Sequence, residues 1–201
     1  MTVRSYRQLK YDSRLGAMSV SRPLVLDLTY PFDWGFVPST RGEDGDPLDA
    51  MLLWDVASYP GVVIECRAIA VMQVEQNKVN HDPSERIRND RIMAVPVSAR
   101  REHALGDLID LPERLKQELE EFASASVALE GKDIRVLGWG DSVAALAMVQ
   151  NGARGGRSTE LIPRRRNPIH SRRWRHTPYP VHPTRLTFLL SRCSFSHDLP
   201  R

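Results

Sequence analysis

The stretch Asp44-Gly45-Asp46-Pro47-Leu48-Asp49 places three carboxylates within six residues. Its glycine and proline favour a tight turn, and the apolar run Met51-Leu52-Leu53-Trp54 that follows is typical of a buried strand. Three like charges held together repel one another unless a cation lies among them. Carboxylate oxygens are hard ligands that suit Mg²⁺, Mn²⁺ or Ca²⁺ better than zinc. The stretch therefore predicts a cation-binding turn at the entrance to a core strand, with a solvated acidic turn as the alternative.

The charge of the chain divides it into two unlike parts. Residues 1–150 contain 17 Lys and Arg against 23 Asp and Glu, whereas residues 151–201 contain 11 Arg, no Lys and 2 acidic residues. This change in composition predicts a globular domain over residues 1–152 and a basic, Arg/Pro-rich, disordered tail over residues 153–201. Two further interpretations of the tail are binding of a polyanion such as RNA or polyphosphate, which we rank lower, and an extended reading frame without a role.

Membrane and secretory classes are not expected. No run of 18 apolar residues is present, and the first twelve residues, MTVRSYRQLKYD, lack the apolar core of a signal peptide. The two cysteines support neither a disulfide framework nor a zinc site. We therefore expect a cytoplasmic protein without a membrane partner.

Strand patterns come first along the chain and helix patterns last. Residues 15–20 and 24–28 are expected to form a hairpin, and the alternation over residues 62–75 predicts a long strand. Asp110, Pro112 and Glu113 are start signals for a helix, and a second helix is expected to begin at Asp141 or Ser142 and to end at residues 151–152. This order predicts an α+β fold with a sheet or barrel core.

The run from Tyr30 to Asp49, YPFDWGFVPSTRGEDGDPLD, resembles the signature region of soluble, Mg²⁺-dependent inorganic pyrophosphatases. Shorter matches include Lys10-Tyr11-Asp12, Ser21-Arg22-Pro23 and Gly138-Trp139, and the similarity covers about residues 8–150. The resemblance implies a small closed five-stranded β-barrel (OB-like) flanked by two main helices. It also implies hydrolysis of pyrophosphate to two phosphates with Mg²⁺-activated water, Mn²⁺ as an alternative cofactor, and a homo-oligomer.

The same resemblance assigns roles to individual residues. Asp44 and Asp49 would be metal ligands, and Asp46 would be the general base that acts on the attacking water. Arg22 would grip the phosphate product, and Tyr30 would support the substrate site. The physical reason is that metal ions neutralise a highly anionic substrate while basic side chains hold the leaving phosphate.

The second half of the site departs from the family pattern. Asn89 stands where a metal-bridging Asp is usual, and the neighbouring Asp90 is a slightly preferred substitute ligand. Arg91 stands in place of a phosphate-binding Lys, and Arg88 is a further candidate for the phosphate grip. The other altered contacts are Gln8, Lys10, Trp34 and Ala125-Ser126. These changes leave a weakly active or non-catalytic metal- and phosphate-binding paralogue as an alternative.

Overall fold

The computed structural model describes residues 2–3, 7–12, 15, 17–25, 28–56, 58–77, 85–156, 186–190 and 195–196. The strands are β1 (Thr2–Val3), β2 (Arg7–Asp12), β3 (Ala17–Pro23), β4 (Asp33–Phe36), β5 (Asp49–Leu52), β6 (Val63–Asn77), β7 (Arg86–Arg88), β8 (Arg91–Pro96), β9 (Ile134–Gly140), β10 (Leu186–Leu190) and β11 (Phe195–Ser196). They form a seven-stranded mixed sheet and two separate two-stranded sheets (β1 with β11 and β2 with β3), which together with two α-helices confirm the α+β class. The helices are α1 (Glu113–Ala125) and α2 (Ser142–Gly156), preceded by the short 3₁₀ turns η2 (Glu102–Ala104) and η3 (Leu108–Asp110).

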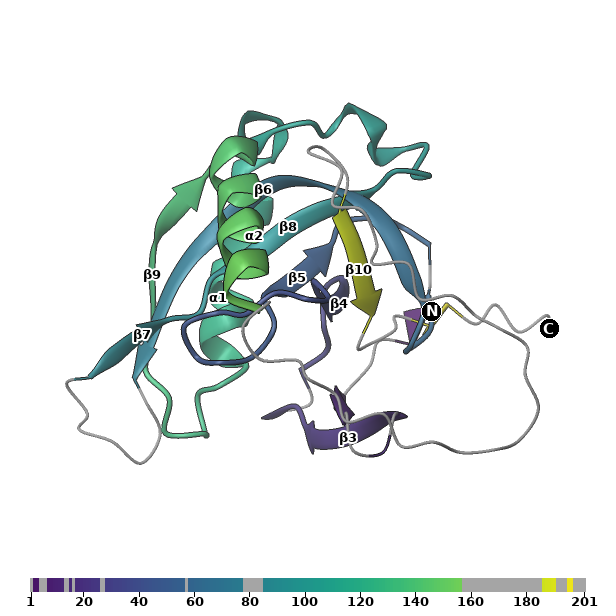
Figure 1. Ribbon diagram of the computed structural model, residues 1–201. Helices are drawn as coiled ribbons and strands as arrows, with labels where there is room; N and C mark the ends of the chain where they lie inside the picture. The colour runs from purple at the N-terminus through teal and green to yellow at the C-terminus, as the bar shows by residue number, and fades with distance from the viewer. Residues whose placement is uncertain are drawn as a thin grey trace, which may run out of the picture.

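The long strand β6 organises the sheet. From its start to its end it pairs antiparallel with β10, β8, β9 and β7. Beyond β8 lie β5, which runs parallel to β8, and then β4, which is antiparallel to β5. Figure 1 shows β6 arching over the molecule with β8 beside it.

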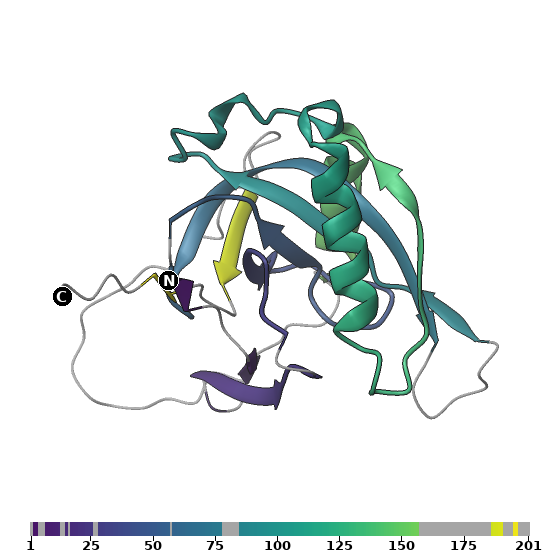
Figure 2. The same ribbon diagram turned by 180° about the vertical axis from the view of Figure 1, so that it is seen from behind.

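The central strands are buried on both faces because each face has its own helix. Alternate residues of β5 and β8, such as Leu52 and Ile92, pack with Val149 of α2. The residues between them, such as Met51 and Met93, belong to a second cluster that includes α1. Because side chains alternate across a strand, one apolar run supplies both clusters. The two views show α2 in front of β6 and β8 from one side and α1 in front from the other (Figures 1 and 2).

Part of the basic tail belongs to the sheet. β10 pairs with β6 over residues 186–189 and with β4 at Leu189 and Leu190. The hydrogen-bonded path β10–β4–β5–β8–β6 therefore returns to β10. Helix α2 also runs past the expected domain boundary at residue 152, to Gly156. The remaining expectations for the tail, including disorder and polyanion binding by its arginines, fall largely on residues 157–185 and lie outside the described residues.

Two local predictions were wrong. The N-terminal hairpin joins Arg7–Asp12 to Ala17–Pro23 rather than residues 15–20 to 24–28. Pro23 ends the strand because proline has no N–H to donate. Asp110 does not cap α1, because its carboxylate accepts hydrogen bonds from the N–H groups of Gly106 (2.8 Å) and Asp107 (3.0 Å) and so closes η3.

Helix α1 instead starts directly after Pro112, whose restricted φ suits that position. Asp141 does cap α2 as predicted, accepting from the Ala144 N–H at 2.9 Å. Neither helix in the described part of the chain is long and apolar enough to cross a membrane.

Candidate active site

The acid turn, residues 44–49, is shaped by a short network of backbone and side-chain hydrogen bonds. Thr40 Oγ1 donates to the Val37 carbonyl at 2.6 Å and accepts from the Leu48 N–H at 3.1 Å. The N–H of Gly42 donates to the Asp46 carbonyl at 2.8 Å. Gly45 has a φ of 86°, a conformation that side chains disfavour. These hydrogen bonds therefore hold the backbone that carries the three carboxylates in one conformation.

Helix α2 supports the turn from behind. The N–H of Arg41 donates to the Gly152 carbonyl at 3.1 Å. A Cβ atom at Gly152 would come within 2.8 Å of Leu48 Cδ1, so a larger residue there would have to displace the Leu48 side chain. The end of α2 thus helps to fix the position of the acid turn. The sequence pattern did not reveal this role.

Two basic side chains offset part of the negative charge of the three carboxylates in the acid turn. Lys10 Nζ lies 3.2 Å from Asp46 Oδ2, and Arg91 Nη1 lies 2.9 Å from Asp49 Oδ2. Partial burial raises the pKa of Asp44 and of Asp49, and the charges of their neighbouring carboxylates raise both further. Arg91 opposes this rise in both carboxyls. A nearby cation therefore stabilises the charged form of the carboxylates in the acid turn.

A cavity of about 260 Å³ lies beside the turn. It collects side chains from the hairpin, the acid turn, the middle of the sheet and the end of α1, which are remote in sequence. Seven of the predicted site residues line it, namely Arg22, Tyr30, Asp44, Asp46, Asp49, Asn89 and Arg91. Metal-ligand, base and phosphate-binding candidates thus share one cavity.

Aromatic rings form one wall of this cavity. Tyr30 makes edge contacts with Trp34, at a centroid distance of 5.5 Å, and with Phe122 of α1, at 5.0 Å. The Arg91 guanidinium lies 5.2 Å from the Trp34 ring centroid. Trp34 therefore contributes a cation–π contact that orients Arg91 toward Asp49.

Asn89 and Asp90 face different surroundings. Asn89 lines the 260 Å³ cavity, where its side-chain oxygen accepts a hydrogen bond from Arg91. The Asp90 carboxylate accepts from the Val74 N–H at 2.7 Å and from Arg88 at 2.9 and 3.1 Å. Asp90 and Arg88 line a neighbouring hollow of about 590 Å³ against α2, which Asn89, Asp44 and Asp49 also border. Asn89 thus borders both hollows, while Asp90 and Arg88 are paired with each other outside the main cavity.

Two charged residues of the site were not predicted from the sequence. Lys132 lines the cavity from the turn before β9, and Glu130 beside it pairs with Arg22. Lys10 was noted only as a departure, yet it lines the cavity and pairs with Asp46. No local pattern marks Gly131-Lys132-Asp133 as more than a polar turn, so only the packing of α1 against β9 could have revealed Lys132.

The donor atoms at the acid turn fit a hard divalent cation. Three carboxylates and the Asn89 amide oxygen border the cavity, and these are the oxygen ligands that Mg²⁺ and Mn²⁺ take. In the described part of the chain, no three His, Cys, Asp or Glu side chains already stand together as a metal cluster. Lys10 and Arg91 each engage one carboxylate, so a cation would have to replace these ion pairs.

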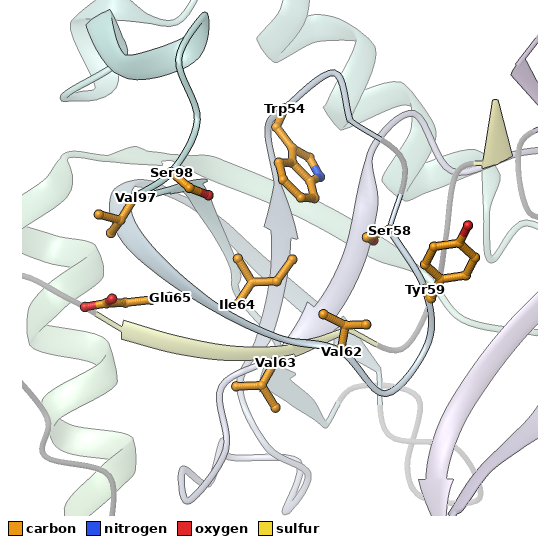
Figure 3. A pocket seen from close by; sticks show the side chains of 9 residues that line it. All are labelled: Trp54, Ser58, Tyr59, Val62, Val63, Ile64, Glu65, Val97 and Ser98. Atoms are coloured by element: carbon orange, nitrogen blue, oxygen red, sulfur yellow. The ribbon is translucent and has the colours of Figure 1, made fainter.

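A different hollow lies at the start of β6 and is predominantly apolar. Its volume is about 500 Å³, and Figure 3 shows the side chains that line it, among them Trp54, Tyr59, Val62 and Ile64. It contains none of the predicted site residues. The predicted site residues therefore lie at the cavity beside the acid turn and at its neighbour.

Comparison with known proteins agrees with this arrangement. A family model described as inorganic pyrophosphatase matches residues 2–155. The chain is 37% identical over 149 residues to an inorganic pyrophosphatase of Thermus thermophilus, covering 73% of this chain and 81% of the relative. It is 34% identical over 143 residues to one of Haloferax volcanii, covering 71% and 76%.

Solved structures show the same similarity. The inorganic pyrophosphatase structure from Thermus thermophilus superposes with a TM-score of 0.68 at 33% identity, covering 78% of this chain and 90% of that one. The Helicobacter pylori structure gives a TM-score of 0.69 at 26% identity, with 78% and 89% covered. On the strength of the family match and these relatives, the chain belongs to the inorganic pyrophosphatase family.

Proposed function

We propose that this chain hydrolyses inorganic pyrophosphate to two phosphates with the help of Mg²⁺ at the acid turn. The observation that carries this function is the convergence of Asp44, Asp46 and Asp49 with Arg22 and Arg91 on one cavity, in a chain of the inorganic pyrophosphatase family. A polyanionic substrate needs both kinds of group, because its oxygens must be neutralised while its leaving phosphate is held. Mn²⁺ is the alternative metal.

Each side chain has a distinct role in this proposal. Asp44 and Asp49 hold the metal, with Asn89 adding a neutral oxygen and Asp90 a carboxylate from the neighbouring hollow. When bound, Mg²⁺ supplies charge neutralisation and lowers the pKa of a water molecule. Asp46 accepts the proton of the attacking water.

Basic and aromatic side chains complete the site. Arg22 and Arg91 bind phosphate oxygens, for which a guanidinium offers paired donors. Arg88 would join them if its pairing with Asp90 opened. Tyr30 orders the wall against which Trp34 and Arg91 pack.

The test is phosphate release from Mg-pyrophosphate by the purified full-length protein. Asp46→Asn should lower kcat by about 10²- to 10⁴-fold, because it removes the proton acceptor. Asp49→Asn should weaken Mg²⁺ binding. Asp55→Asn is the control, since Asp55 pairs with Arg101 and lies outside the cavity. Absence of metal-dependent release, or equal rates in Asp46→Asn and the wild type, would sink the proposal.

A weakly active metal- and phosphate-binding paralogue is the second candidate. Two observations favour it: the ion pair between Lys10 and Asp46, and the neutral Asn89 among the metal donors. Calorimetry showing tight binding of Mg-pyrophosphate without turnover would support this candidate over the first. A third candidate is polyanion binding through the basic tail. It is tested by measuring whether the full-length protein binds RNA or polyphosphate.

We also propose that the five paired strands β10, β4, β5, β8 and β6 form the closed barrel of the domain. The pairing of β10 with both β4 and β6 supports this. Leu189 pairs on both sides, so Leu189→Pro should lower Tm. A Tm equal to that of the wild type would contradict the closed barrel.

The place of action and the assembly state complete the proposal. We propose a cytoplasmic homo-oligomer in which residues 1–152 supply the catalytic and binding side chains, and β10 adds a strand to their sheet. Light scattering on the full-length protein tests the assembly, and a monomeric mass at micromolar concentration would contradict it.

A further inference from the structure

Trp34 lies beside Asp49 and Arg91 because three neighbouring strands carry these residues at matching positions. Trp34 of β4 is opposite Met51 of β5, which follows Asp49 by two residues. β5 and β8 run parallel with Met51 opposite Met93, and Arg91 precedes Met93 by the same two residues. Side chains two residues apart in a strand point to the same face of the sheet. The register therefore places the indole, the carboxylate and the guanidinium side by side, and all three line the 260 Å³ cavity.

The Trp34 side chain contacts both members of the ion pair between Asp49 and Arg91. It donates a hydrogen bond to the Asp49 side chain, and the indole Nε1–H is the only donor that this side chain has. The Arg91 Cζ atom lies 5.2 Å from the centroid of the same ring. One indole therefore offers its edge to an anion and its face to a cation.

The indole is itself held in place by aromatic and apolar neighbours. Tyr30 is only 5% exposed, and its ring makes edge contacts with Trp34 at 5.5 Å and with Phe122 of α1 at 5.0 Å. Trp34 also packs against the core cluster that contains Met51 and Met93. A side chain whose rotamer is fixed by packing can orient a neighbouring ligand group before the ligand binds.

We propose that Trp34 is a positioning residue for the metal of the acid turn. Its N–H fixes the Asp49 carboxylate for a divalent cation, and its ring face keeps Arg91 at the cavity when the cation takes the place of Arg91 at Asp49. This proposal rests on the proposed function and deepens it, because it assigns control of metal affinity to a residue that is not itself a ligand. Hydrogen bonds from the surroundings orient a metal-binding carboxylate, and the loss of such a partner costs about tenfold to a hundredfold in metal affinity.

Trp34→Phe is the first variant, because it keeps a ring beside Arg91 and removes only the N–H donor. In calorimetric titrations of the full-length protein with Mg²⁺ and no substrate, it should weaken Mg²⁺ binding about tenfold or more. Trp139→Phe is the matched control. Trp139 Nε1 also donates to a carboxylate, that of Glu120 at 2.6 Å, and its ring packs against the same core cluster, but it lies outside the cavity. This control should leave the Mg²⁺ affinity within about twofold of the wild type.

Fluorescence distinguishes a positioning role from a merely structural one. A cation that reaches Asp49 changes the surroundings of the Trp34 indole, so Mg²⁺ should alter the tryptophan emission of the wild type and of Trp139→Phe. The change should be much smaller in Trp34→Phe. Thermal unfolding of each variant measures stability separately. A lower Tm in Trp34→Phe, together with a wild-type Mg²⁺ affinity and a wild-type emission change, would overturn the proposal.

Trp34→Leu tests the ring face. Leucine removes the surface on which Arg91 lies, whereas phenylalanine keeps a ring there. At saturating Mg²⁺, KM for Mg-pyrophosphate should therefore be about threefold to tenfold higher in Trp34→Leu than in Trp34→Phe. Equal KM values in the two variants, or a wild type without turnover, would overturn the role of the ring.

Metal binding and turnover are measured separately, so this proposal and the catalytic one can fail independently. Weaker Mg²⁺ binding by Trp34→Phe supports the role of the N–H even if the wild type releases no phosphate from pyrophosphate, an outcome that would sink the catalytic proposal. Equal Mg²⁺ affinities in the wild type and Trp34→Phe, or no Mg²⁺ binding by the wild type, would overturn the role of Trp34. Phosphate release by a wild type whose Mg²⁺ affinity equals that of Trp34→Phe would leave the catalytic proposal standing alone.

Discussion

Arg91 is the counter-charge of Asp49, and replacing it should destabilise the metal-free protein more than the metal-bound protein. The two side chains meet at 2.9 Å, with Arg91 10% and Asp49 29% exposed. Removing one partner of a fully buried ion pair costs about 3–5 kcal/mol. Because Asp49 remains partly exposed to water, we expect Arg91→Met to cost about 2 kcal/mol. For a domain of this size that corresponds to a Tm lower by about 4–8 °C.

Mg²⁺ should reverse much of this loss. In the wild type, a cation at Asp49 has to compete with Arg91, whereas in Arg91→Met the carboxylate is available to it. Stabilisation by a ligand grows as its affinity for the folded state grows. The deficit in Tm should therefore fall by about half or more at saturating Mg²⁺.

The assay is thermal unfolding of wild type and Arg91→Met over a series of Mg²⁺ concentrations. Arg114→Met is the control, because Arg114 forms an exposed ion pair with Glu118 at 3.2 Å, and such pairs contribute little. A deficit that is the same at every Mg²⁺ concentration, or no deficit at all, would refute the view that Arg91 substitutes for a metal ion.

Two further perturbations test the charge balance elsewhere. Hydrogen bonds from Ser142 and Leu108 lower the pKa of Asp107, so its stabilising effect is present above the unfolded pKa, near 4, and is lost as pH falls through the folded pKa. Asp107→Asn should accordingly lower Tm at pH 7, and the Tm difference from the wild type should shrink as the pH falls. A Tm difference that does not depend on pH would contradict this. Lys10→Gln removes a cation 3.2 Å from Asp46 and should tighten Mg²⁺ binding about twofold to fivefold in a calorimetric titration; unchanged affinity would show that the ion pair does not compete with the metal.

The acid turn could be predicted from the sequence because its structure is local. Glycine and proline set the turn, and the apolar run after it has the length and composition of a buried strand. The cap of α1 was mispredicted because Asp110 had a nearer use, closing η3 on the backbone of Gly106 and Asp107. A side chain with two possible backbone partners cannot be assigned to one of them from spacing alone.

The parts of the site that could not be predicted depend on contacts between distant segments. Lys132 reaches the cavity, and Glu130 reaches Arg22, only because the end of α1 and the start of β9 bring their turn beside β3. Gly152 supports the acid turn only because α2 packs behind it. The family resemblance located the acid turn, but the positions of the substituted basic residues could be found only in three dimensions.

The position of β10 in the sheet also has a consequence for how the protein is made. β4 and the first residues of β6 are synthesised early, yet the strand that pairs with both comes only after residue 185. Until then the nascent chain carries two open strand edges, which are templates for pairing with other chains. Slower translation of residues 157–185 would lengthen the time during which the edges of β4 and β6 can pair with other chains, so translation speed through that segment is expected to affect aggregation.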